Sequence, residues 1–283
     1  MNYTFKKTLI CLLAPTLLAC TLTAASQAET LKTGADASYA PLVFRDLDGT
    51  LKGFTIDMGH ALEKQLGVTI SVEGTQFSAL IPALNAKKYD FILGAVTATR
   101  ERAEQMLFSE PYLDSDYLIL QKKDTETIKS LDQLKGKRLA VNRGSPYETW
   151  SQENHEKYGF AFNVYPTNAD AIQAILSGRA DLGMAGVPAQ AWAAKQNPLL
   201  KTSLEIKTGQ AWAYAFRKDD IAMRDRISTA LKCLKQKGIV AEIAKKWLGF
   251  APTATQTIYE GQGLKGMPGY DPTPVQLNCG EQK

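Results

Sequence analysis

Short apolar runs alternate with longer amphipathic stretches along the chain from residue 31 onward. The runs have the length of β-strands: LKTGAD, VTISVEG, FILGAV, LILQ, RLAVNR, FNVYP, DLGMAG, LEIKT and WAYAFRK. Between them, apolar residues recur at helical spacing, which predicts helices over 54–66, from Phe77 and over 168–176. This alternation of strands and helices predicts an α/β fold in which helices cover parallel sheets.

The pattern divides into two sets. The first runs to about Tyr117 and the second from Ser130 to near Glu205, with the polar connection QKKDTETIKS between them. After Thr208, two more helical segments are expected, over 221–237 and 239–248. The remainder, 251–283, is rich in Gly, Pro, Thr and Gln and shows no periodicity, so it is expected to be a coil on the surface.

The N-terminus has the pattern of an export signal. Lys6 and Lys7 precede an apolar run, 9–22, that is too short to span a membrane comfortably. The small residues at Ser26 and Ala28 predict a signal peptide, 1–28, cleaved after Ala28, with a periplasmic mature protein. The motif LLAC leaves a lipoprotein anchored at Cys20 as an alternative.

Composition and charge add a few limits. The net charge is +4, and loss of the signal peptide with Lys6 and Lys7 leaves about +2, with no basic stripe that would indicate nucleic acid. Cys11 and Cys20 lie in the signal region, so two cysteines remain in an exported protein, which favours one Cys233–Cys279 disulfide.

Two junctions between a strand and a helix carry candidate chemistry. In GAVTATRER, Thr99 is expected to cap a short helix that holds Arg102 in its first turn, where the helix dipole disfavours a cation. That arginine either faces solvent or is directed at an anion. In VNRGSPYE, Ser145, Pro146 and Glu148 form an expected capping box with Pro at the first helical position.

The second junction either only starts a helix or offers its free N–H groups to an anion. Ligands of open α/β sheets bind beyond the carboxyl ends of the strands. Two halves facing one another would therefore form a cleft with these two helix starts on opposite sides.

At this point the sequence resembles a known family. The segments TGADASYAPLVFRDLDGTLKGFTIDMGHALEKQLGV and FSALIPALNAKKYDFILGAVTATRERAEQMLFSEPY resemble the N-terminal lobe of bacterial solute-binding proteins of the polar amino acid ABC-transporter family (family 3). The resemblance continues through LKGKRLAVNRGS, DAIQAILSGRADLGMAG and WAYAFRK. It implies a two-lobed periplasmic binding protein fold (type II), with two crossover strands, YLILQKK and the segment near LEIKTGQ, as the hinge.

The implied lobes are 29–118 with 210–250, and 122–206, followed by the tail 251–283 that the disulfide ties down. The implied activity is that of the solute-binding component of an ABC importer, which captures a small carboxylate-bearing solute and delivers it to an inner-membrane permease. The protein is expected to be a monomer that needs no cofactor or metal and binds no nucleic acid.

The resemblance also implies a ligand-binding set, carried over position by position. Arg102 matches the arginine that grips a ligand carboxylate with two N–H bonds. The other matching positions are Asp36, Tyr39, Phe77, Gly94, Ala95, Thr97, Asn142, Ser145, Pro146 and Gly186. Gly186 departs from the pattern, because amino-acid binders carry there the acidic residue that pairs with the ligand ammonium. Either Asp36 takes over that role, or the ligand has no free α-ammonium, or the ligand is larger and fills the space left by glycine.

Two other function classes are weighed against transport. A cyclohexadienyl-dehydratase-like enzyme on the same fold would need an acid or base in the cleft. The site offers Gly186 there, and His60 and His155 fall in helical segments, His155 on a solvated face. We therefore expect no enzyme and no catalytic residue. A sensor that presents its ligand to a separate receptor is the second alternative.

Overall fold

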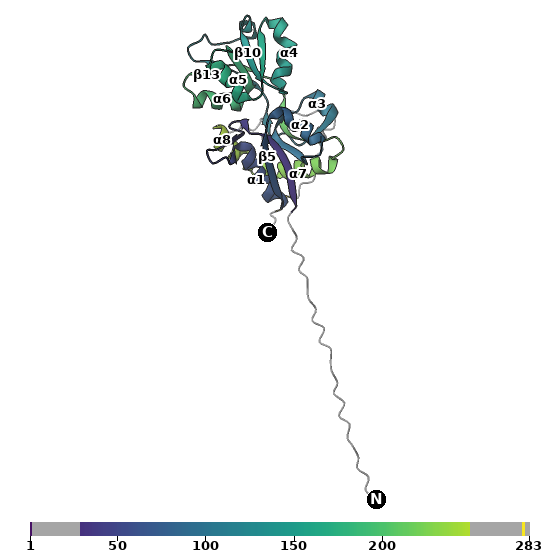
Figure 1. The fold of residues 1–283 in the computed structure, drawn as a ribbon. Coiled ribbons are helices and arrows are strands. Elements are labelled where there is room, and N and C mark those ends of the chain that lie inside the picture. The colour runs from purple at the N-terminus through teal and green to yellow at the C-terminus, as the bar shows by residue number, and fades with distance from the viewer. Residues whose placement is uncertain (2–28, 250–278, 281–283) are drawn as a thin grey trace.

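The computed structural model describes residues 1, 29–249 and 279–280. The expected signal peptide, the lipoprotein alternative at Cys20 and nearly all of the expected tail lie outside the described residues. Figure 1 shows two lobes, one above the other, each built on its own sheet.

The first lobe is a sheet with the strand order β5-β1-β6-β14-β7, and β8 also pairs with β14. Its strands are β1 (Thr30–Asp36), β5 (Thr69–Thr75), β6 (Phe91–Thr97), β7 (Met106–Phe108), β8 (Leu113–Asp114) and β14 (Ala211–Arg217). Its helices are α1 (Phe54–Leu66), α2 (Phe77–Asn85), α3 (Arg100–Gln105), α7 (Ile221–Gln236) and α8 (Ile239–Leu248). A small sheet completes the lobe with β2 (Ser38–Tyr39), β3 (Val43–Arg45) and β4 (Leu51–Lys52).

The second lobe is a sheet with the order β11-β10-β12-β9-β13. Its strands are β9 (Tyr117–Lys122), β10 (Arg138–Asn142), β11 (Ala161–Tyr165), β12 (Leu182–Gly186) and β13 (Leu200–Ile206). The helices are α4 (Pro146–Tyr158), α5 (Asn168–Leu176), α6 (Val187–Gln196) and the 3₁₀ helix η1 (Leu131–Leu134). These elements form the upper lobe of Figure 1.

Both sheets are mixed, which differs from the expectation of parallel sheets. β1 pairs in parallel with β5 and β6, and β10 in parallel with β11 and β12. By contrast, β14 runs antiparallel to β6, and β9 runs antiparallel to β12 and β13. The strands β9 and β14 each enter their sheet from the other lobe rather than through a covering helix, so they run against their neighbours.

At both junctions the expected residue caps the helix. Thr99 Oγ1 accepts a hydrogen bond from the Arg102 amide at 3.2 Å, and Ser145 Oγ accepts one from the Glu148 amide at 3.2 Å. The expected capping box at Ser145 is only half formed, because Glu148 Oε2 accepts from the Gly144 amide at 2.6 Å instead of from Ser145. Each junction therefore places a helix start directly after a buried strand.

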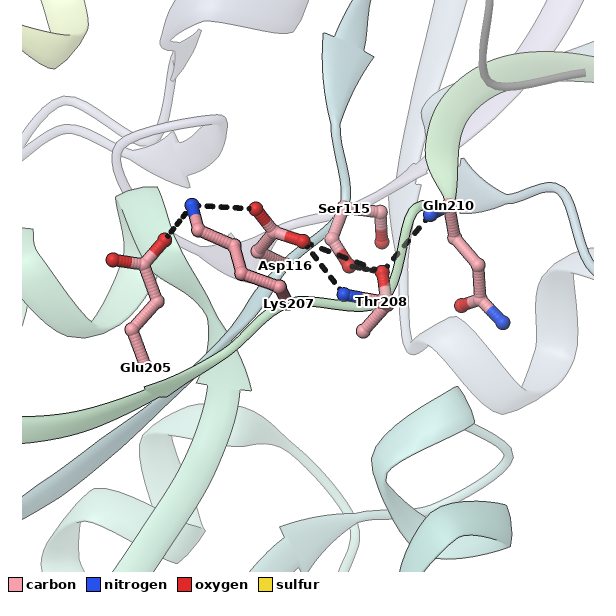
Figure 2. Close-up of polar contacts among 6 residues, drawn as sticks. All are labelled: Ser115, Asp116, Glu205, Lys207, Thr208 and Gln210. Carbon is pink, nitrogen blue, oxygen red and sulfur yellow. Dashed lines mark hydrogen bonds and ion pairs between the residues drawn. The ribbon is translucent and has the colours of Figure 1, made fainter. Parts of the chain in front are cut away.

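The two lobes are joined by the connections 115–116 and 207–210, and Figure 2 shows how these lie side by side. The Ser115 amide donates to Gln210 O at 2.9 Å, and Thr208 Oγ1 donates to Ser115 O at 3.0 Å. These bonds hold the two connections together at the point where the chain passes between lobes.

The Asp116 carboxylate also links the two connections (Figure 2). Its Oδ1 accepts from the Thr208 amide at 2.9 Å, and its Oδ2 lies 2.9 Å from Lys207 Nζ. Lys207 Nζ also lies 2.6 Å from Glu205 Oε1. Hydrogen bonds and charge from these two carboxylates raise the pKa of Lys207.

The expected Cys233–Cys279 disulfide is present, with the two Cα atoms 5.3 Å apart. Cys233 is buried on α7, so the bond ties the C-terminal part of the chain to the first lobe. Within the described residues, no helix has both the length and the apolar character needed to cross a membrane.

Candidate ligand-binding cleft

A small cavity of about 20 Å³ lies between the two lobes, with room for about one water molecule. The first lobe contributes the ends of β1 and β6, the start of α2 and part of β14, and the second lobe contributes the end of β10 and the start of α4. The lining residues are Asp36, Tyr39, Leu42, Val43, Phe77, Leu80, Gly94, Ala95, Thr97, Asn142, Ser145, Pro146, Tyr147 and Trp212.

Arg102 bridges the two lobes at one side of this cavity. Its Nη1 donates to Thr97 O at 3.0 Å, and its Nη2 donates across the cleft to Gly144 O at 3.0 Å. The guanidinium carbon lies 5.5 Å from the centre of the Phe77 ring. Burial lowers the pKa of Arg102, yet a guanidinium stays protonated in proteins. None of the described carboxylates forms an ion pair with it.

A pair of tyrosine hydroxyls closes the cleft beside Gly186. Tyr39 of the first lobe and Tyr147 of the second have their hydroxyl oxygens 2.8 Å apart. The Gly186 amide donates to the Tyr39 hydroxyl at 3.0 Å. Burial raises the pKa of both tyrosines, and it raises that of the neighbouring Tyr117 to about 12, so these phenols are neutral.

Trp212 forms the floor of the cavity. Its indole Nε1 donates to Thr97 Oγ1 at 3.0 Å, and this hydroxyl lies 2.7 Å from Ser115 Oγ in the first interlobe connection. The side chain is 1% exposed, and its ring lies edge-on to Tyr39 with centroids 6.3 Å apart. Hydrogen bonds through Thr97 thus link Trp212 to the interlobe connection 115–116.

Among the described residues, Asp36 is the one acidic residue that lines the cavity. Its Oδ1 accepts from the Ser38 amide at 3.0 Å and from Ser38 Oγ at 2.6 Å. Burial raises the pKa of this carboxyl, while hydrogen bonds from Ser38 and from the Phe77 backbone oppose the shift. Asp36 is therefore a buried carboxylate with local donors of its own.

The predicted binding residues lie together at the interlobe cavity, nine as part of its lining and two beside it. All of them line the cavity except Arg102 and Gly186, which contact its walls through the hydrogen bonds given above. The sequence analysis did not identify Tyr147 and Trp212 as site residues. Tyr147 follows Pro146 directly, but its hydroxyl gains its place only when the lobes meet. Trp212 belongs to β14, whose residues 211–216 are all apolar or aromatic, so the pattern does not single it out.

The groups that line the cleft are suited to holding an anion. It offers one guanidinium, one shielded carboxylate, and aromatic and small residues between them. Among the described residues, no group of three or more His, Cys, Asp or Glu side chains is placed to hold a metal ion. The arrangement suits non-covalent binding of a solute that carries a negative charge.

A larger depression, of about 700 Å³, lies on the outside of the first lobe along α1 and α8. Two of its charged side chains pair with each other, since Lys246 Nζ lies 2.6 Å from Asp57 Oδ2. It receives nothing from the second lobe, so movement of the lobes would not enclose a ligand there. The interlobe cavity is the better candidate in spite of its smaller volume.

Comparison with known families agrees with this geometry. Residues 31–250 match the family model described as bacterial extracellular solute-binding proteins, family 3. The chain belongs to this family. As a family 3 protein it is a two-lobed solute-binding protein, and the expectations from its motifs are confirmed at that level.

Two curated relatives of this chain are named as binding proteins. The chain is 31% identical over 222 residues to the L-cystine-binding protein TcyJ of Escherichia coli (strain K12), covering 78% of this chain and 83% of the relative. It is 33% identical over 217 residues to the arginine-binding extracellular protein ArtP of Bacillus subtilis (strain 168), covering 76% and 84%. A solved ancestral arginine-binding protein bound to arginine has a TM-score of 0.74 and 34% identity, covering 78% of this chain and 98% of that one.

Proposed function

We propose that this protein is the solute-binding component of an ABC importer and works as a monomer. It captures a small carboxylate-bearing polar solute, an amino acid or an amino-acid derivative, between its lobes and delivers it to an inner-membrane permease. The amino-acid-binding relatives support the class of solute, and the family supports the partner.

The observation that carries this proposal is that Arg102 has no described carboxylate partner in the protein. Among the described residues, the guanidinium beside the interlobe cavity donates to the neutral carbonyls of Thr97 and Gly144, one from each lobe, and to no carboxylate. A buried or partly buried charge is stabilised best by an opposite charge with matching hydrogen bonds. A ligand carboxylate supplies that charge and would bind the two N–H groups in parallel.

Movement about the connections 115–116 and 207–210 would admit the ligand. The cavity of about 20 Å³ is smaller than any amino acid, so the lobes have to separate for binding and close again afterwards. We propose the lobes as 29–118 with 210–250, and 122–206. The signal peptide, cleaved after Ala28, places the mature protein in the periplasm, and a lipoprotein anchored at Cys20 is the alternative.

A thermal-shift screen of the mature protein tests the function. The compounds are amino acids, their N-modified derivatives and carboxylates without an amine, because a bound ligand raises the melting temperature by mass action. We expect hits only among carboxylates. In Arg102→Ala the affinity for each hit should fall about a hundredfold or more, since two charge-assisted hydrogen bonds are lost.

Arg100→Ala is the matched control, because Arg100 lies on the same helix with its side chain exposed. It removes the same charge from α3 and should leave the shift unchanged. A hit that keeps its full shift in Arg102→Ala would show that the carboxylate is held elsewhere. A screen without any hit among carboxylates would contradict the proposed function itself.

A further inference from the structure

The second-lobe wall of the cleft carries no negative charge. The residues that this lobe contributes to the cavity are Asn142, Ser145, Pro146 and Tyr147, and all of them are neutral. The acidic group of the cavity, Asp36, belongs to the opposite wall. A positive charge on the ligand that faced the second lobe would therefore have no counter-charge there.

Gly186 shows that this wall is filled by aromatic groups. A Cβ atom added at Gly186 would lie 2.5 Å from Trp212 Cζ2 and 3.0 Å from the Tyr147 hydroxyl oxygen. Trp212 is fully buried and anchored by its bond to Thr97, so its ring does not move aside cheaply. No acidic side chain fits at this position while Trp212 occupies it.

Asp36 is a poor substitute for a second-lobe acid. Its carboxylate already accepts two hydrogen bonds from Ser38 and is further stabilised by the Phe77 backbone. Both Ser38 bonds end on Oδ1, and the carboxylate lies in the first lobe, across the cleft from Asn142 and Gly186.

Asn142 provides a different kind of partner. Its side-chain Oδ1 is buried and has no hydrogen-bond partner among the described residues, and the residue lines the cavity beside Ser145. A buried acceptor without a partner is costly, so a ligand that donates to it is favoured. An amide oxygen satisfies a hydroxyl or an amide N–H fully but gives an ammonium no compensating charge.

We propose that the ligand carries, beside its carboxylate, a neutral hydrogen-bond donor instead of an ammonium group, as a 2-hydroxy acid or an N-acylated amino acid does. This inference rests on the proposed function and narrows its class of solute. Arg102 receives the carboxylate, Asn142 accepts from the neutral donor, and Trp212 and Gly186 form an uncharged wall next to it.

Matched sets of compounds test the inference on the unmodified mature protein by calorimetric titration. Each set shares one side chain: L-alanine, L-lactate and N-acetyl-L-alanine; L-leucine, 2-hydroxyisocaproate and N-acetyl-L-leucine; L-glutamate, 2-hydroxyglutarate and N-acetyl-L-glutamate. In the set that binds best, a neutral member should bind about tenfold or more tightly than the amino acid, because the ammonium loses hydration without gaining a charged partner.

Raising the pH through the titration of the ligand's own amine gives a second readout. The amino acid should then approach the affinity of its 2-hydroxy analogue, whose binding changes little. An amino acid that binds as tightly as its 2-hydroxy and N-acetyl analogues at neutral pH would overturn the inference. If Arg102→Ala then abolished binding of that amino acid, the proposed function would still stand. If no member of any set binds, the proposed function fails and the inference falls with it.

Asn142→Asp is the sharpest variant, because it places a carboxylate on the second-lobe wall with almost no change of shape. The ratio of affinities should shift about tenfold or more toward the amino acid. Asp36→Asn serves as the contrasting variant and should leave this ratio unchanged. A ratio that changes with Asp36→Asn but not with Asn142→Asp would assign the amine to the first lobe and overturn the inference.

Discussion

The two charged residues of the cleft, Arg102 and Asp36, differ in the partners that they have within the protein. Arg102 is bonded to carbonyl oxygens of both lobes and has no described carboxylate partner. Asp36 has local donors but has lost water, so its pKa is raised above the ordinary value of 3.8. The cation is available to a ligand, whereas the carboxylate affects the stability of the lobe itself.

Asp36 should make the stability of the first lobe depend on pH. Its folded-state pKa is raised, so between 3.8 and that raised pKa the folded protein binds more protons than the unfolded chain. The contribution of Asp36 to the free energy of unfolding is therefore highest in acid and falls as the pH rises through the folded-state pKa. Asp36→Asn should remove this slope, as urea unfolding at a series of acidic to neutral pH values would measure. An identical slope in both proteins would contradict this assignment.

Sequence reasoning reached the site residues that follow a strand or start a helix. Local signals at strand ends and caps made Arg102 and Ser145 candidates, and the family motifs then assigned them to the site together with Asp36 and Tyr39. Trp212 and Tyr147 were missed. Their place in the cleft depends on how the lobes meet, and no local pattern encodes that.

At the scale of elements, the two interlobe connections are held together by Asp116. Its carboxylate accepts from the Thr208 backbone amide and also meets Lys207, whose side chain is 74% exposed. An exposed ion pair contributes little to stability, while a shielded carboxylate bonded to a backbone amide contributes more. The amide bond, rather than the lysine, is thus expected to hold the connections in register.

Asp116→Ala should lower the free energy of unfolding by about 1–3 kcal/mol, because it leaves the Thr208 amide without its acceptor. Lys207→Ala is the control and should cost less than about 1 kcal/mol. Urea unfolding of both variants, at low and at high salt, gives the comparison. Equal losses in the two variants would mean that the ion pair, not the backbone contact, stabilises the connections.

Helices and strands with a clear hydrophobic periodicity could be predicted from the sequence, and those without it could not. The amphipathic α1 and the buried β6 were recognised from their spacing alone. Helix α6 was not predicted, since only Ala189 and Gln190 of its residues are buried and it shows no apolar face. The antiparallel direction of β9 and β14 also has no local signal, because it follows from the passage of the chain between lobes.

At the scale of the whole molecule, the lobes meet through bonds that a ligand would have to share or replace. Arg102 reaches Gly144, and Tyr39 reaches both Tyr147 and Gly186. The remaining cavity of about 20 Å³ is too small for a solute. The described arrangement is therefore a closed form, and the proposed binding would require an open one.

A crystal structure of the mature protein with the tightest-binding carboxylate from the screen would show whether Arg102 holds the ligand. We expect the ligand between the lobes, with its carboxylate oxygens about 2.7–2.9 Å from the guanidinium nitrogens of Arg102 and with contacts to both walls. A carboxylate held away from Arg102, or a ligand bound in the depression along α1 and α8, would contradict it.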